Sequence, residues 1–159
     1  MQRRVVAIAL VAVSCLAIAD RQGSAGPWTI ESALKSSGLS HSRTGTDAYV
    51  VVFAASKTRD VESWPITVRS VAGGDWVLVF ATLLRSASGE FDDEVLERAL
   101  IHNARAAGSK FSLDAETGDL DIQYEIPLVA LTPELLRLII NDVAVTCDEQ
   151  YRPFQDLAN

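Results

Sequence analysis

Apolar and polar residues alternate most regularly between Lys110 and Pro127, in the sequence KFSLDAETGDLDIQYEIP. The second half of this stretch puts four apolar residues on one side and four polar residues on the other: Leu120, Ile122, Tyr124 and Ile126 against Asp119, Asp121, Gln123 and Glu125. A period of two predicts a β-strand. The first half has the same period, and the intervening AETG supplies turn residues. We therefore predict a β-hairpin with one buried face and one solvated, acidic face.

Three earlier stretches also predict strands. Ala48–Ala55 and Trp76–Leu84 are apolar on both faces and rich in β-branched residues, which is typical of buried strands. Trp64–Val71 alternates, with Pro65 near its beginning, where a missing N–H is tolerable. A tight turn at Gly73-Gly74-Asp75 joins Trp64–Val71 to Trp76–Leu84. These strands predict an antiparallel meander.

The polar stretch Ser40–Asp47, SHSRTGTD, shows no alternation, and we expect a loop there. Helical spacing on either side of the meander predicts two helices. The first begins at an N-cap, Thr29, and stops at Gly38. The second begins at Asp92 and ends at Gly108. Its apolar stripe is expected to contain these residues: Val95, Leu96, Ala99, Leu100, Asn103, Ala106 and Ala107.

A third helix follows the hairpin. Thr132 is its expected cap and Pro133 occupies the first helical position. Its apolar face is broad: Leu135, Leu136, Ile139, Ile140, Val143 and Cys147. We expect Arg152-Pro153 to end or break the helix, leaving Phe154 to Asn159 as a tail whose Phe154 packs back onto the sheet.

The first nineteen residues have the pattern of a secretory signal peptide. Two arginines precede an uninterrupted apolar run, and small residues at Ala17 and Ala19 form an A-x-A cleavage site before Asp20. The sequence predicts cleavage there, a flexible leader over residues 20–28, and one α+β domain over residues 29–159. The exported protein is then periplasmic or secreted.

Cys15 leaves open a second mode of export, as a lipoprotein acylated at that cysteine. The apolar run from Val5 to Ala19 is fifteen residues long, shorter than the ~20 that a spanning helix needs. Apart from the possible lipid anchor, we expect no membrane association. Cys147 is the other cysteine, so the exported chain has no intramolecular disulfide, and we expect a buried, unreactive thiol.

The charge of the chain argues against nucleic acid as a partner. The formal net charge is −7; residues 1–19 contain two arginines and no acid, so their removal leaves 12 Lys+Arg against 21 Asp+Glu, a net of −9. Basic residues are scattered singly, without the basic patch that phosphate-binding proteins use.

Motifs for catalysis, metal or cofactor binding are missing from the sequence. Counted from Asp114, a calcium-loop template fails because Gly118 falls at the fifth position and Asp119 at the sixth, which requires glycine. His41 and His102 have no partner at ligand spacing. We therefore predict a protein without enzymatic activity and without a cofactor.

The order of elements is α-β-β-β-α-β-β-α. That order, with GSKFSLDAETGDLDIQYEIPL after the second helix and LTPELL opening the last, resembles the YbjN-type domain, whose fold is like that of type III secretion chaperones. The resemblance implies a twisted, antiparallel, five-stranded sheet flanked by helices. It also implies frequent homodimers, binding of extended or partly unfolded protein segments on apolar surfaces, and no enzymatic activity.

Two functions remain open. The first is an exported, chaperone-like or regulatory protein-binding module; the second is a small periplasmic enzyme or ligand-binding protein with an unrecognised site. A large exposed apolar patch would favour the first, and a pocket with convergent titratable groups the second. Candidate partner-binding residues are Trp64, Val68 and Trp76. The two tryptophans are either ordinary core residues or partly exposed anchors for a protein segment or a second subunit.

Overall fold

The computed structural model describes residues 28–58, 60–87 and 89–158. The predicted signal peptide with its cleavage site at Ala17, Ala19 and Asp20, the alternative acylation site Cys15, and leader residues 20–27 lie outside the described residues. Within the described part of the chain, no helix is both long and apolar enough to cross a bilayer.

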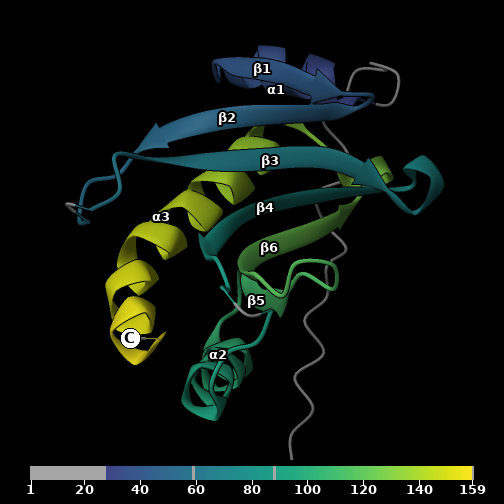
Figure 1. Ribbon diagram of the computed structural model, residues 1–159. Helices are drawn as coiled ribbons and strands as arrows, with labels where there is room; N and C mark the ends of the chain where they lie inside the picture. Colours follow the sequence, from purple (N-terminus) through teal and green to yellow (C-terminus); the bar gives the residue numbers. More distant parts are fainter. Residues whose placement is uncertain (1–27, 59, 88, 159) are drawn as a thin grey trace, which may run out of the picture.

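Six antiparallel strands form one twisted sheet in the order β1-β2-β3-β4-β6-β5. Along the chain the elements are α1 (Ile30–Ser37), β1 (His41–Gly45), β2 (Ala48–Ala54), β3 (Ser63–Val71), β4 (Trp76–Leu84), α2 (Asp93–Arg105), β5 (Lys110–Leu113), β6 (Leu120–Pro127) and α3 (Pro133–Ala158), with short 3-10 turns at Ala72–Gly74 and Leu128–Ala130. The long helix α3 crosses one face of the sheet, and α2 lies at the β5 end (Figure 1). The α+β class, the meander and the hairpin are confirmed.

The expected number of five strands is wrong, because the predicted loop Ser40–Asp47 contains a strand. β1 pairs with β2 from His41↔Val51 to Gly45↔Ala48. Four of its five residues are exposed, so both of its faces meet solvent and no apolar alternation marks it. Such a polar edge strand is a common protection of a sheet against pairing with other chains.

The core lies between α3 and one face of the sheet. Every second residue of β3 and β4 points into it, and both strands are buried there: Trp64, Ile66 and Val68 from β3, and Val77, Val79, Ala81 and Leu83 from β4. The residues of α3 that meet them are Leu136, Ile139, Ile140, Val143 and Cys147. The predicted burial of Cys147 is confirmed, and burial raises the pKa of its thiol to about 12.

Helix α3 does not end at Arg152-Pro153, as expected from the sequence, but continues through Pro153 to Ala158. The helix loses one backbone hydrogen bond at the proline, yet the next residue, Phe154, is fully buried. Its ring stacks on Phe111 of β5 at a centroid distance of 4.6 Å, and the Arg98 guanidinium lies over it. Burial of this aromatic residue holds the last turns in place. The predicted contact of Phe154 with the sheet is therefore confirmed, although it is made from a helix.

Of the two other helices, α1 follows its sequence signals at both ends and α2 only at its start, after Asp92. At α1, Thr29 and Ser32 form a reciprocal capping box and Gly38 takes the left-handed conformation with φ 74°, as predicted. At α2, the predicted end at Gly108 is wrong, because the chain turns extended at Ala106. The expected position of Leu100 in the apolar stripe is also wrong, since its side chain is 68% exposed. α2 packs mainly on the short strand β5, which covers only a narrow stripe of it.

Candidate binding cleft

The central strands β3 and β4 are paired along only half of their length. Their ladder runs from Val71↔Trp76 to Thr67↔Phe80 and stops there. Beyond this point the first half of β3 pairs only with β2, and the last part of β4 pairs only with β6. Figure 1 shows the two strands diverging at this end, with α3 passing behind the opening. The sheet is therefore continuous at one end and split at the other.

Two features of the strands coincide with the split: Pro65 in β3, and a register shift in β4 between Thr82 and Leu84. The N–H of Ser70 donates to the carbonyl of Asp47 at 3.0 Å, on the β2 side. Because backbone groups alternate along a strand, even-numbered residues of β3 point their N–H toward β2 and odd-numbered residues toward β4. The next pair that could exchange hydrogen bonds, two residues beyond Thr67↔Phe80, would be Pro65 with Thr82, and proline has no N–H to donate. The β3–β4 ladder thus ends where its next donor is missing.

The opening is a cavity of about 860 Å³, here called the β3–β4 cleft. Its first wall is the start of β3 with the residues before it, and its second is the end of β4 with the loop that follows. The last turns of α3 close its inner end. Its lining combines apolar and aromatic side chains, hydroxyl groups, one amide and three charged groups: Val61, Ser63, Trp64, Pro65, Thr67, Phe80, Ala81, Thr82, Leu83, Leu84, Arg85, Ser86, Ala87, Glu90, Phe91, Asp92, Tyr151, Gln155 and Ala158.

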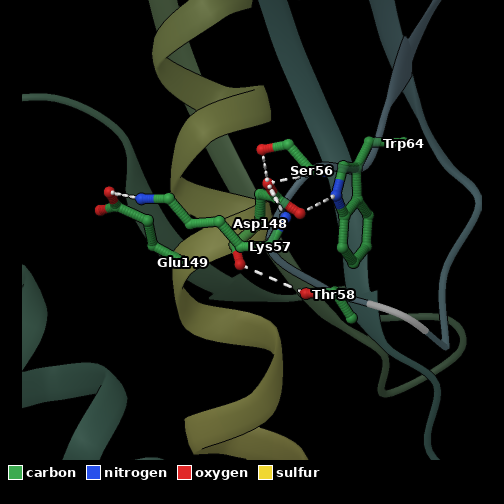
Figure 2. Close-up of polar contacts among 6 residues, drawn as sticks. All are labelled: Ser56, Lys57, Thr58, Trp64, Asp148 and Glu149. Carbon is green, nitrogen blue, oxygen red and sulfur yellow. Dashed lines mark hydrogen bonds and ion pairs between the residues drawn. The ribbon is translucent and has the colours of Figure 1, made fainter.

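The loop between β2 and β3, which leads into the first wall, is fixed to α3 through Asp148 (Figure 2). One carboxylate oxygen of Asp148 accepts hydrogen bonds from the Ser56 N–H and hydroxyl at 3.0 and 2.6 Å and from the Lys57 N–H at 2.8 Å. The other accepts from the Trp64 indole N–H at 3.4 Å. Burial acts to raise the pKa of Asp148, but these hydrogen bonds outweigh it and hold the pKa below its usual value.

Two ion pairs reinforce the same attachment. The Lys57 ammonium lies 2.6 Å from Glu149, and Arg152 pairs with Asp60. All four side chains are about half exposed, so each pair contributes little by itself. Together with Asp148, they fix the loop that carries Val61 against the exposed side of α3. One wall of the cleft is thus preorganised.

The three predicted partner-binding residues do not form one surface. Trp64 and Val68 are 3% and 0% exposed, so Trp64 is a core residue and not a partly exposed anchor. Trp76 is 41% exposed but lies at the closed end of the β3–β4 pair, beside Pro127. Of the three, only Trp64 borders the cleft, where its ring meets Tyr151 edge-on at 5.5 Å. Partner binding by these residues stays a prediction.

The charged residues of the cleft lie at its mouth. Arg85, Glu90 and Asp92 are all exposed. No group of three or more His, Cys, Asp or Glu side chains in the described ranges is placed to hold a metal ion. His102 lies on α2, edge-on to Phe111 at 4.8 Å, and burial lowers its pKa. The titratable side chains that line the cleft are Arg85, Glu90, Asp92 and Tyr151.

The expected solvation of the acidic hairpin face is wrong for Asp121. This residue is 6% exposed, and burial raises the pKa of its carboxyl above the usual value. Its neighbours across the strands are Thr82 and Ser112, and one carboxylate oxygen has no hydrogen-bond partner. The loop after β4 packs on the hairpin, where the Ser86 N–H donates to Asp119 at 2.9 Å. The alternation of apolar and polar residues along a strand could not predict this contact between two loops.

Comparisons with known proteins identify the fold. No family model and no curated protein matches the sequence. Among solved structures, the chain is similar to the HopA1–SchA chaperone–effector complex, with a TM-score of 0.56 and 11% identity over 78% of this chain and 91% of that chain. It is also similar to the type III secretion chaperone SycH from Yersinia pestis in complex with a fragment of YscM2, with a TM-score of 0.51 and 10% identity over 75% and 93%.

A third similar structure is YbjN from E. coli, a proposed transcription regulator, with a TM-score of 0.51 and 16% identity over 78% of this chain and 90% of that chain. At such identities the likeness concerns the fold. The chain has the α+β fold of YbjN and of the type III secretion chaperones, with a sixth strand, β1, beyond the predicted five. The resemblance stated from the sequence is thus confirmed.

Proposed function

We propose that this protein is an exported, non-enzymatic binding module that holds a segment of another protein. The observation that carries the proposal is the β3–β4 cleft: about 860 Å³, with an apolar and hydroxyl-bearing interior and with charge only at its mouth. An enzyme site of this size would bring an acid, a base or a nucleophile together inside it. The two chaperones of the same fold were crystallised with protein partners, which supports the class of ligand.

Export is part of the proposal and rests on residues 1–19. The arginine pair, the apolar run and the small residues at Ala17 and Ala19 favour a cleaved signal and a periplasmic or secreted protein. Intact mass of the protein recovered from the extracytoplasmic fraction tests this directly. A mature N-terminus at Asp20 supports the proposal, acylation at Cys15 converts it to a lipoprotein, and an intact Met1 in the cytoplasm contradicts it.

A second copy of the chain is the other protein partner to consider, as the fold resemblance implies homodimers. The observation that favours it is on α2, where Leu100 and Ile101 are 68% and 43% exposed. Two adjacent apolar side chains on an incompletely covered helix can pack against the same helix of a second subunit. Sedimentation of the wild type and of Leu100→Glu distinguishes a dimer through α2 from a monomer.

Binding of a protein segment is tested by capture and reconstitution. The wild type and Ser63→Trp, which fills the cleft from a half-buried lining position, are used as baits on an extracytoplasmic extract. A protein captured by the wild type is then purified and titrated against both baits. Saturable binding to the wild type supports the proposed function. If no purified candidate binds the wild type, and a purified preparation instead turns over a small molecule, the alternative of an enzyme replaces the proposal.

A further inference from the structure

We propose that the partner segment binds as an added β-strand in the split between β3 and β4, and that this segment combines apolar with basic residues. The inference rests on the proposed function and specifies the geometry of its site. It follows from the unfinished ladder of these strands, from the position of Pro65 and from the charge around the opening.

The split presents backbone groups that the rest of the sheet does not use. Odd-numbered residues of β3 point toward β4, so the N–H and C=O of Ser63 and the C=O of Pro65 face the opening. Thr67 pairs with Phe80, so even-numbered residues of β4 point toward β3, and the N–H and C=O of Thr82 face the opening from the other side. Addition of an extended peptide to such strand edges supplies binding energy through main-chain hydrogen bonds.

The split is unlike the outer edges of the same sheet. β1, at one edge, is mostly polar and exposed, and β5, at the other, is four residues long. Such short or polar edges disfavour pairing with other chains. Inside the split, a guest strand would contact side chains on both of its faces, since Phe80 and Pro65 lie on one side of the sheet and Leu83 lies on the other, near Tyr151 of α3. In the split, therefore, a guest strand would bury its side chains as well as form main-chain hydrogen bonds.

The composition of the guest follows from the lining and from charge. The interior takes apolar side chains, because its walls are Pro65, Phe80, Leu83 and Phe91. The exposed charged residues of the lining are two acids, Glu90 and Asp92, and one cation, Arg85. Two more exposed acids, Glu62 and Asp93, adjoin lining residues in the sequence. A negative rim attracts cationic segments and speeds their association. The occupant is thus a segment of another protein in which apolar residues alternate with lysine or arginine, rather than a second copy of this acidic chain.

Pro65 gives the inference a specific test. Pro65→Ala restores the missing N–H donor opposite Thr82 and allows the β3–β4 ladder to extend into the split. The variant thereby closes the site, and every other lining side chain stays unchanged. The matched control is Pro127→Ala, at the end of β6 beyond the β5 pairing, away from the cleft. A second variant, Ser63→Trp, fills the opening even if Pro65→Ala leaves the strands apart.

The probes are fluorescently labelled synthetic peptides that alternate valine with lysine, titrated by anisotropy against the full purified chain. A second peptide has the same sequence with N-methyl groups on alternate residues, which abolish its hydrogen bonds along one edge. A third replaces lysine by glutamate. We expect saturable binding of the first peptide to the wild type and to Pro127→Ala. Binding should weaken by about tenfold or more in Pro65→Ala and in Ser63→Trp, and for the second and third peptides, because each loses hydrogen bonds, space or charge attraction.

Several results would overturn the inference. They are equal binding of the peptide and its N-methylated form, unchanged binding by both cleft variants, or no saturable binding of the valine-lysine peptide. Dimerisation of the chain that the valine-lysine peptide disrupts, measured by sedimentation, would assign the site to a second copy and would also overturn it. The proposed function is judged separately, by the purified natural partner. If that partner binds wild type and Ser63→Trp equally, the protein is a binding module that uses another surface, and the strand-addition site is wrong.

Discussion

The two ends of the β3–β4 pair differ although the same two strands run through both of them. At the closed end, Val71↔Trp76 to Thr67↔Phe80 form a regular ladder. At the open end, the same strands diverge around a cavity of about 860 Å³. The side chains that point toward α3 are buried at both ends, so hydrophobic burial does not distinguish them. The comparison teaches that a missing backbone donor at Pro65 and a register shift in β4 after Thr82 can interrupt a ladder while the core beside it stays intact.

The two tryptophans on these strands provide the largest expected contrast. Trp64, at the open end, is 3% exposed, and Trp76, at the closed end, is 41% exposed. Trp64→Ala should lower the free energy of unfolding by ~3–5 kcal/mol, since it leaves a cavity in the core. Trp76→Ala should cost much less, because part of its ring already meets water. Chemical denaturation monitored by circular dichroism measures both, and similar losses for the two variants would contradict the assigned burial.

The core shared by both ends can be tested from α3. Ile139 is 2% exposed and Leu138, its neighbour in the chain, is 66% exposed. Ile139→Ala should cost ~2–5 kcal/mol of the ~5–15 that holds a domain of this kind. Leu138→Ala is the matched control and should leave the denaturation midpoint nearly unchanged. Were the two midpoints to shift equally, the orientation of α3 on the sheet would be wrong.

Two carboxyls near the open end should respond to pH in opposite directions. The pKa of Asp148 is lowered, because hydrogen bonds from Ser56 and Lys57 outweigh its burial, so its contribution to stability is present above its unfolded pKa and is lost as the pH falls through the folded value. The pKa of Asp121 is raised by burial, so its charged form opposes folding near neutral pH and the opposition is relieved as the pH falls.

Thermal melts of Asp148→Asn and Asp121→Asn across the acidic range test these signs. Asp148→Asn should lower the melting temperature at neutral pH and reduce the loss of stability on acidification. Asp121→Asn should keep or raise the melting temperature at neutral pH, and the difference from wild type should shrink in acid. Reversed signs in either variant would mean that the surroundings of that carboxyl are assigned incorrectly.

The sequence was sufficient to locate the strands and helices that bury one apolar face. The alternation after Asp119 and the helical spacing after Thr132 located β6 and α3, because both bury an apolar face. β1 was missed because an exposed edge strand carries no apolar signal. The end of α3 was misplaced because burial of Phe154, which depends on distant Phe111 and Arg98, outweighs the local effect of Pro153.

The cleft could not be read from the sequence for a different reason. Pro65 was visible as a proline in a strand, but whether its missing N–H faces β2 or β4 depends on the register of three strands. The partners of Asp148 in the β2–β3 loop and in β3 are separated from it by 84 to 92 residues along the chain. Neither relation has a periodic signature. Pro65 was the sequence feature that bears on the cleft, but its effect could be inferred only once the pairing of β2, β3 and β4 was known.

Amide hydrogen exchange at Thr82 tests the central claim most directly. Pro65→Ala gains a hydrogen bond of about 0.5–1.5 kcal/mol but loses about 0.4–1 kcal/mol of proline's stabilising restriction on the unfolded chain, so global stability will not decide the matter. The local amides will. In the wild type, the Thr82 N–H should exchange about tenfold or more faster than that of Phe80, which lies on the same side of β4 but pairs with Thr67. In Pro65→Ala, exchange at Thr82 should slow toward the rate at Phe80. Equal protection of both amides in the wild type would contradict a split sheet.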